Sequence, residues 1–286
     1  MDQKTISGLT MAELLKFALL EDLGDGDHTS LSTIQSKSVS KAIVKVKETG
    51  IIAGILVAEH VLQLVDQEII AKAMARDGDV VTTGQIAMEL EGNTRALLRA
   101  ERILLNCMQR MSGIASLTRK YVDAISGTNS KILDTRKTTP NFRLFEKWAV
   151  LSGGGTNHRF GLYDMILIKD NHVDAAGGIV QAIRKANKYI EETGKNLQIE
   201  IETRNLEEVR QVISEGNVQR IMLDNFGPAL LKEAIELIKG NYVTEASGGI
   251  VLENVRDYAL TGVNFISVGA LTHSYKSLDI SMKLIS

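Results

Sequence analysis

The pattern of apolar and polar positions divides the chain near residue 130, and the part before it predicts a mixture of helix and antiparallel sheet. Residues 10–24 have a helical pattern in which Thr10 precedes the first turn, Glu13 stands three positions later and Gly24 follows the last turn. These are the signals of a capping box and of a C-terminal glycine, so they predict a helix with defined ends. Alternating runs at 41–48, 67–75 and 85–92 predict antiparallel strands with one solvated face.

A long helical pattern follows, from about residue 94 to residue 125. The stretch SGIAS at 112–116 interrupts it. We therefore expect two helices that meet near Gly113.

After residue 130, apolar segments alternate with helical segments six times. The apolar segments lie at 131–137, 165–171, 197–205, 220–226, 242–250 and 265–271. This alternation predicts parallel strands joined by crossover helices, and nearly all-apolar strands are typical of a sheet covered on both faces. Regular spacing, without a glycine-rich dinucleotide loop after the first strand, favours an α/β barrel over a doubly wound sheet.

Composition adds limits on the partners of the chain. Of the 286 residues, 44% are hydrophobic and 24% charged, and the formal net charge of −2 offers no general attraction for nucleic acid, so any anion site must be local. No apolar run approaches the ~20 residues of a membrane span, and the first residues lack a signal-peptide pattern. Cys107 is the only cysteine, which excludes an intrachain disulfide and a CxxC metal site. We expect a cytoplasmic enzyme.

Charged and small residues gather at the ends of the six predicted strands, which is where α/β barrels carry out their chemistry. Cations there can neutralise phosphates or carboxylates, carboxylates can hold Mg²⁺ or ribose hydroxyls, and small residues let backbone N–H groups face a phosphate. One polar strand end is more often structural, but six together predict a site for a substrate with several negative charges. In chain order these residues are Asp134, Arg136, Lys137, Lys169, Asp170, Asn171, Glu200, Glu202, Asp224, Asn225, Glu245, Ser247, Gly248, Gly249, Gly269 and Ala270.

A glycine triplet at 153–155 precedes the second of these strands, and His158 and Arg159 follow it. Their position ahead of Lys169 favours a role in anion binding. We expect His172 to support its loop by hydrogen bonding, whereas His28 and His273 have no assigned role. Arginines on the long helical stretch, Arg102 among them, have on local evidence alone the pattern of a solvated face.

Taken together, the motifs resemble the quinolinate phosphoribosyltransferases, nearly from end to end. They are EDLGDGDHTS, AERILLNCMQRMSGIA, LDTRKTTP, GGGTNHRFGLYDMILIKDNH, LDNF, ASGGI and ISVGALTHS. The resemblance implies a type II phosphoribosyltransferase architecture, with an N-terminal α/β sandwich at 1–115, an incomplete α/β barrel at 116–274, and residues 275–286 packing back on the sandwich. It implies a pentosyltransferase that joins quinolinate to the ribose of phosphoribosyl pyrophosphate with loss of CO2, giving nicotinate mononucleotide for NAD biosynthesis.

The resemblance also assigns roles to residues. It implies that Lys137, Lys169, Glu202 and Asp224 are catalytic, that Glu202 and Asp224 hold Mg²⁺, and that the enzyme is a homodimer or larger. Arg102 would enter the partner's site and bind a quinolinate carboxylate. The substrate-binding set would be Arg102, Thr135, Arg136, Lys137, His158, Arg159, Lys169, Glu202, Asp224, Ser247, Gly248, Gly249, Val268, Gly269 and Ala270.

One position departs from the family pattern. Leu151 stands two positions before the glycine triplet, where a basic residue is expected. Two other functions remain open on sequence grounds. One is a phosphoribosyltransferase for a different pyridine or azole acid, which substrate competition would distinguish. The other is a non-catalytic or transport-accessory barrel protein that binds a phosphorylated metabolite without turnover, although the sequence IKDNH at 168–172 argues against it.

Overall fold

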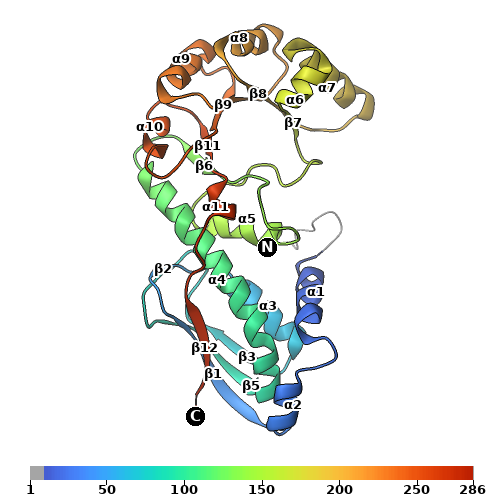
Figure 1. Cartoon of the computed structure of the whole chain (residues 1–286), viewed down its shortest axis with the longest axis vertical. Helices are drawn as coiled ribbons and strands as arrows, with labels where there is room; N and C mark the ends of the chain where they lie inside the picture. Colours follow the sequence, from blue (N-terminus) through green and yellow to red (C-terminus); the bar gives the residue numbers. More distant parts are fainter. Residues whose placement is uncertain (1–9, 286) are drawn as a thin grey trace. The chain divides into compact units, whose positions relative to one another are not determined.

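The computed structural model describes residues 10–285, which divide into two compact units (Figure 1). Unit 1 comprises the residues up to 119, residues 138–154 and the residues from 272 onwards, and unit 2 comprises residues 120–137 and 155–271. The domain limits expected from the sequence, at 115 and 274, stay predictions. The first nine residues, which the signal-peptide argument concerns, lie outside the described part.

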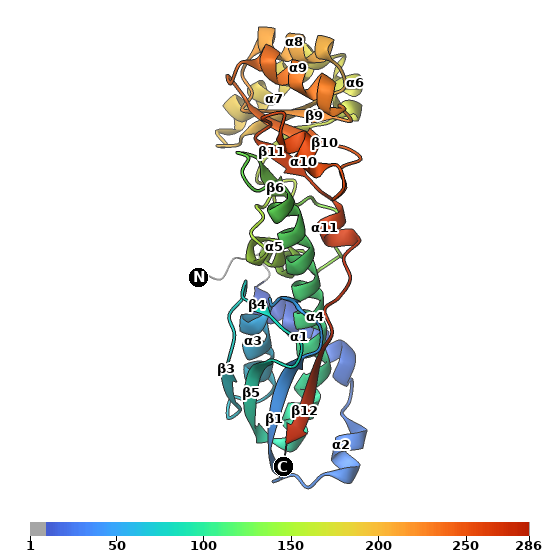
Figure 2. The same ribbon diagram turned by 90° about the vertical axis from the view of Figure 1, so that its left-hand side faces the viewer.

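Unit 1 is built on a four-stranded antiparallel sheet with the strand order β12-β1-β5-β3. The sheet confirms the antiparallel strands expected from the alternating runs, and Figure 2 shows β12, the last strand of the chain, beside β1. A two-stranded ribbon, β2 with β4, accompanies it. The strands are β1 (Val39–Val46), β2 (Gly50–Ile51), β3 (Ile70–Ala73), β4 (Val80–Val81), β5 (Ile86–Asn93) and β12 (Ile280–Ile285).

The helices of unit 1 begin with the one that the sequence defined most closely. In α1 the Thr10 side chain accepts the Glu13 N–H, and the Glu13 carboxylate accepts the Thr10 N–H at 2.7 Å, so the predicted capping box is confirmed. Gly24 ends this helix. The helices are α1 (Met11–Leu23), α2 (His28–Thr33), α3 (Ile55–Val65), α4 (Thr94–Ala124) and α5 (Arg143–Ser152).

The expected break near Gly113 is wrong, because α4 is one continuous helix. The small residues serve close packing instead. A Cβ on Gly113 would lie 2.3 Å from the backbone oxygen of Lys276, so only glycine lets the C-terminal segment pass. The Ser112 and Ser116 hydroxyls accept the backbone N–H groups of Ala53 and Ile51, at 2.9 and 2.8 Å.

Unit 2 contains six parallel strands in the order β6-β11-β10-β9-β8-β7, which confirms the six strand–helix repeats as a parallel sheet. The strands are β6 (Lys131–Leu133), β7 (Ile166–Ile168), β8 (Ile199–Thr203), β9 (Arg220–Asp224), β10 (Val243–Ser247) and β11 (Phe265–Ser267). The helix after β6 is α5, which belongs to unit 1. The helices after the other five strands are α6 (Asp170–Ala176), α7 (Ile179–Thr193), α8 (Leu206–Glu215), α9 (Pro228–Ile238), α10 (Val255–Ala259) and α11 (Ala270–His273).

The strand order is that of an incomplete barrel. Strands β7 to β11 are neighbours in chain order. The first of the six strands, β6, pairs with the last of them, β11, so the sheet curves round in a ring (Figure 1). Among the described residues β6 and β7 do not pair, which leaves the ring open between them, as expected. At the free edge of β6, the Thr156 N–H donates to Ile132 O at 2.8 Å, so one short stretch extends the sheet there.

No helix within residues 10–285 has both the length and the apolar character needed to cross a membrane.

Candidate active site

Most of the predicted site residues lie at one edge of the sheet of unit 2. Because the six strands are parallel, their carboxyl ends meet there. The predicted residues on or directly after these ends are Thr135, Arg136, Lys137, Lys169, Glu202, Asp224, Ser247, Gly248, Gly249, Val268, Gly269 and Ala270. Arg102 lies exposed on α4 in unit 1, and Leu151 lies exposed on α5 in the same unit.

An acidic group with a lysine occupies the ends of three neighbouring strands. Lys169 Nζ lies 2.8 Å from Glu202 Oε2, and the Glu202 side chain is nearly buried. Burial, and after it the charge of Glu202, raises the pKa of Asp224 above its usual range. Asn225 Nδ2 donates to Asp224 Oδ2 at 2.6 Å. Two carboxylates close enough to perturb each other, beside one ammonium group, form an environment that favours a cation.

The glycine pair after β10 shapes the next strand end. Gly248 has a φ of 94°, and a Cβ there would lie 2.2 Å from the Asn225 Oδ1, so the position requires glycine. Gly249 has a φ of 62°, and nothing lies within 4 Å of where its Cβ would stand. The backbone of this turn is therefore open to close approach, as a phosphate site requires.

Two arginines from separate segments lie near each other on the β6 side. Burial, and after it the positive charge of Arg136, lowers the pKa of Arg159 from its usual value. An anion between the two guanidinium groups would relieve this repulsion. The segment that carries Arg159 is fixed to the end of β6, since the His158 N–H donates to the buried carboxylate of Asp134 at 2.9 Å.

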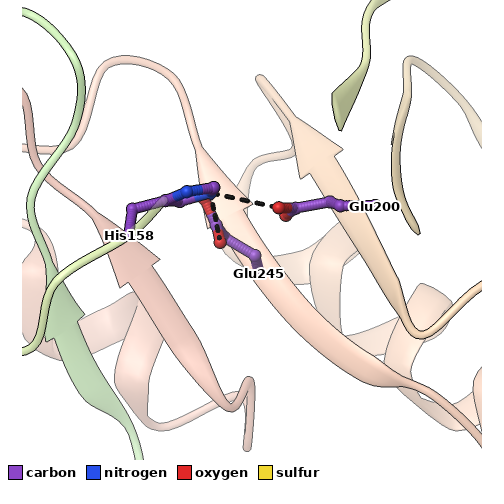
Figure 3. A group of neighbouring side chains, drawn as sticks. All are labelled: His158, Glu200 and Glu245. Carbon is purple, nitrogen blue, oxygen red and sulfur yellow. Dashed lines mark ion pairs between the residues drawn. The ribbon is translucent and has the colours of Figure 1, made fainter. Parts of the chain in front are cut away.

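His158 points into a buried ionic cluster, to which the two glutamates in Figure 3 belong. Its Nε2 lies 3.1 Å from Glu200 Oε2 and 3.3 Å from Glu245 Oε2. Arg220 Nη1 lies 2.9 Å from the same Glu245 oxygen, and the Ser267 hydroxyl donates to the other. Burial acts to lower the pKa of the His158 imidazole, but the carboxylates outweigh it and raise that pKa. Burial, and next the Glu245 charge, raises the pKa of Glu200 to about 7.

The sequence does not indicate this cluster as a unit. It predicts Glu200 and Glu245 only as strand-end carboxylates without a role, and it gives no role to Arg220. A signal was present in the sequence of β8, IEIET, where two glutamates stand in a strand whose five residues are all buried. Glu200 and Glu202 are two positions apart, so they share one face of the strand at successive depths.

The remaining histidines and the cysteine have local explanations. His172 Nδ1 accepts the Lys169 N–H at 2.9 Å, as expected of a loop support. His28 lies 3.3 Å from Asp25, and His273 Nδ1 lies 2.6 Å from the Ser274 hydroxyl. Burial raises the pKa of Cys107 to about 12, so its thiol stays protonated and unreactive.

Comparison with known proteins gives matches along nearly the whole chain. Residues 27–112 match the family model "Quinolinate phosphoribosyl transferase, N-terminal domain", and residues 114–283 match the corresponding C-terminal domain. A chloroplastic nicotinate-nucleotide pyrophosphorylase (carboxylating) of Arabidopsis thaliana is 47% identical over 286 residues, covering 95% of this chain and 82% of the relative. A probable nicotinate-nucleotide pyrophosphorylase of Bacillus subtilis is 45% identical over 274 residues, covering 96% and 93%.

Solved structures agree in fold. The nicotinate-nucleotide pyrophosphorylase from Francisella tularensis superposes with a TM-score of 0.91 at 38% identity, covering 99% of this chain and 98% of that one. The NadC structure from Streptococcus pyogenes gives the same TM-score at 39% identity, covering 99% and 100%.

Proposed function

The chain belongs to the quinolinate phosphoribosyltransferase family, and from this membership we propose how its residues carry out the reaction. The enzyme is a decarboxylating pentosyltransferase of de novo NAD biosynthesis. It transfers phosphoribosyl from phosphoribosyl pyrophosphate to quinolinate and yields nicotinate mononucleotide, pyrophosphate and CO2. The departure at Leu151 thus lies in a chain that has the family activity.

The observation that carries the residue assignment is the division of charge along one edge of the parallel sheet. Arginines gather on the β6 side, the carboxylates Glu202 and Asp224 stand with Lys169 on β7 to β9, and the open glycine turn at 248–249 follows β10. A dicarboxylate, a ribose with its pyrophosphate and a 5′-phosphate need these three environments. In the sheet, β10 and β11 lie between β6 and β9, so the three environments stand around one ring of strand ends.

The β6 side is the proposed binding place for quinolinate. Arg136 and Arg159 bind its carboxylates, and His158 belongs to the same group through its contact with the Arg159 backbone, 2.6 Å from N to Nδ1. Lys137 and Lys169 lie between the dicarboxylate and the phosphoribosyl pyrophosphate. Thr135 supports this loop, because its hydroxyl accepts the Lys137 N–H at 3.0 Å.

The ends of β10 and β11 are the proposed binding place for the 5′-phosphate of the ribose. Gly249 leaves open space at the turn after β10, and the Val268 N–H donates to Leu133 O at 3.0 Å, which ties the end of β11 to β6. The residues of this subsite are Ser247, Gly248, Gly249, Val268, Gly269 and Ala270.

The donor set of Glu202 and Asp224 fits Mg²⁺. Both are hard oxygen ligands, and the raised pKa of Asp224, due to burial and then to Glu202, reports negative charge that a dication would offset. These two residues would hold the ion together with the ribose hydroxyls. When bound, Mg²⁺ neutralises charge on the departing pyrophosphate.

The chemistry requires positioning and charge stabilisation, and no protein nucleophile. The quinolinate nitrogen forms a bond to the anomeric carbon as the bond to pyrophosphate breaks, and the nearby carboxylates stabilise the cationic character of the ribose. Lys137 and Lys169 stabilise the leaving pyrophosphate. The alkylated ring nitrogen is then positive, so the electron pair left at C2 by loss of CO2 is stabilised before a proton replaces the carboxylate. The cations of the β6 side hold the ring during both steps.

We propose a homodimer in which Arg102 reaches the partner's site. Arg102 is exposed on α4 and belongs to unit 1, whereas the other proposed quinolinate ligands belong to unit 2. The family resemblance supports its assignment to a quinolinate carboxylate in the neighbouring subunit. A cytoplasmic location stays a prediction, since plant relatives are named as chloroplastic or mitochondrial.

The direct test is turnover by the purified chain with quinolinate, phosphoribosyl pyrophosphate and Mg²⁺, with nicotinate as a parallel substrate. We expect nicotinate mononucleotide from quinolinate alone, detected by chromatography. Product from nicotinate alone would contradict the decarboxylating reaction. Omitting Mg²⁺ and adding a chelator should abolish turnover, and undiminished turnover would contradict the metal assignment.

A further inference from the structure

A buried cluster lies next to the proposed site, one layer of side chains further from the carboxyl ends of the strands. Its members are His158, Glu200, Glu245, Arg220 and Ser267. Glu200 precedes Glu202 by two positions on β8, and Glu245 precedes Ser247 by two positions on β10, so each pair faces the same side of its strand. The upper member of each pair belongs to the substrate site. The lower members are fully buried and turn toward His158 (Figure 3).

Both ring nitrogens of His158 are engaged by the protein. The Arg159 backbone N–H, which can only donate, lies 2.6 Å from Nδ1, so this contact requires the neutral ring with a lone pair on Nδ1, although, against the effect of burial, the carboxylates at Nε2 raise the pKa of the ring. The ring hydrogen therefore stands on Nε2, which faces Glu200 and Glu245 at 3.1 and 3.3 Å. The side chain is only 6% exposed. Neither nitrogen is thus directed to a substrate carboxylate.

A metal ion does not fit the same three side chains. Their ligand atoms lie within 4.8 Å of one another, which is close enough for coordination. However, a hydrogen on Nε2 leaves no lone pair for a metal.

We propose that Glu200 and Glu245, supported by Arg220, are positioning residues for quinolinate binding that act through His158 on Arg159. The two carboxylates lie 3.1 and 3.3 Å from Nε2 and attract the Nε2–H edge of the ring. The fixed ring presents Nδ1 to the Arg159 N–H. The Asp134 carboxylate accepts a hydrogen bond from the His158 backbone N–H at 2.9 Å. Together these contacts set the backbone at Arg159 and so the direction of its guanidinium. The proposal rests on the proposed role of Arg159 as a quinolinate ligand.

A double-mutant cycle on the full chain tests this path. Quinolinate affinity is measured by calorimetry for the wild type, Glu245→Gln, Arg159→Ala and the double variant, and KM for phosphoribosyl pyrophosphate is measured for wild type and Glu245→Gln. We expect Glu245→Gln to weaken quinolinate binding about tenfold or more, since a small misplacement of a binding group is costly. KM for phosphoribosyl pyrophosphate should stay within about twofold, because the described side-chain contacts of Glu245 are with His158, Arg220 and Ser267, none of which is a proposed ligand of that substrate. In the Arg159→Ala background Glu245→Gln should have no further effect.

The matched control is Glu208→Gln. Glu208 is also a buried carboxylate paired with an arginine, Arg204 at 2.6 Å, but it lies on α8 and touches no proposed ligand. Its substitution should leave quinolinate affinity unchanged. Glu200→Gln is the second variant and should behave as Glu245→Gln does, which keeps the test valid if one variant folds poorly.

Two results would overturn the proposal, and they are distinguishable. If Arg159→Ala weakens quinolinate binding but Glu245→Gln costs the same factor with and without Arg159, the path through His158 is wrong and the proposed function stands. If Arg159→Ala leaves quinolinate affinity unchanged, the proposed role of Arg159 is itself wrong, and the inference falls with it.

Discussion

At the residue scale, the side chains of the proposed site are held by one another before any substrate contact is considered. Lys169 has Glu202 as its partner at 2.8 Å, and burial, then the charge of Arg136, lower the pKa of Arg159. Quinolinate and pyrophosphate complete this balance of charge. Removing one cation therefore leaves an anion without its partner in a partly desolvated place.

Arg136→Ala and Lys169→Ala should each lower kcat/KM at least about 30-fold, because losing one charged partner of a desolvated anion costs on the order of 2–5 kcal/mol. Steady-state kinetics on purified variants measures this. Lys188→Ala is the control, since Lys188 lies on α7 with 73% of its side chain exposed. Activity near that of the wild type in either site variant would show that the cation is misassigned.

The buried cluster should make stability depend on pH. The folded-state pKa of Glu200 is about 7, raised from an ordinary 4.5 by burial and next by the Glu245 charge. Glu200 thus binds its proton more tightly in the folded chain than in the unfolded chain. The contribution of Glu200 to the free energy of unfolding is fully present below about pH 4.5 and is lost as pH rises through about 7.

Glu200→Gln removes this dependence, because glutamine does not titrate. The difference in Tm between Glu200→Gln and the wild type should therefore become more positive as pH rises from 5.5 to 8.5. Thermal unfolding at a series of pH values measures it, with Glu208→Gln as the control. A difference that stays constant, or falls, with pH would mean that Glu200 is ionised throughout.

Residue types at strand ends could be predicted from the sequence, but their partners could not. The carboxylates of Glu202 and Asp224 follow apolar runs and therefore stand out. The contact of His158 with Glu200 and Glu245 joins a loop to two strands that are 42 and 87 residues further along the chain. Nothing in the local sequence pattern indicates that the curvature of the sheet brings these three side chains together.

At the element scale, hydrophobic periodicity predicted most strands, because burial on one or both faces leaves a period that can be read directly. The α4 helix shows where this reading fails. Small residues mark either a helix end or a close contact, and Gly113 packs against the backbone of Lys276, which lies 163 residues away in the sequence. Only the long-range contact distinguishes the two meanings.

Gly113→Ala should destabilise the protein although it favours helix. Alanine gains about 1 kcal/mol of helix propensity, whereas the new Cβ would stand 2.3 Å from the Lys276 oxygen, and overpacking costs about 1–3 kcal/mol. We expect a net loss, measured as a lower midpoint of chemical denaturation. Gly227→Ala is the control, since nothing lies within 4 Å of its Cβ position. A stabilised Gly113→Ala protein would contradict the close contact.

At the scale of the whole molecule, the proposed active site needs two chains. Arg102→Ala and Lys169→Ala homodimers should each have little activity, because each lacks one cation in every site. Mixed dimers should regain part of it, since one of their two sites then carries both cations. Co-expression with two different affinity tags isolates the mixed dimers for assay. Verified mixed dimers no more active than the parents would exclude the shared site.

The pairing of β12 with β1 also bears on how the chain is made. Residues 280–285 leave the ribosome last among the described elements, yet they cover one edge of a sheet whose other strands end by residue 93. During translation β1 is therefore an exposed edge strand until β12 has been made, and it can pair with strands of other nascent chains. A chain released before residue 280 is made would keep that edge open, so early release and aggregation are linked through this one pair of strands.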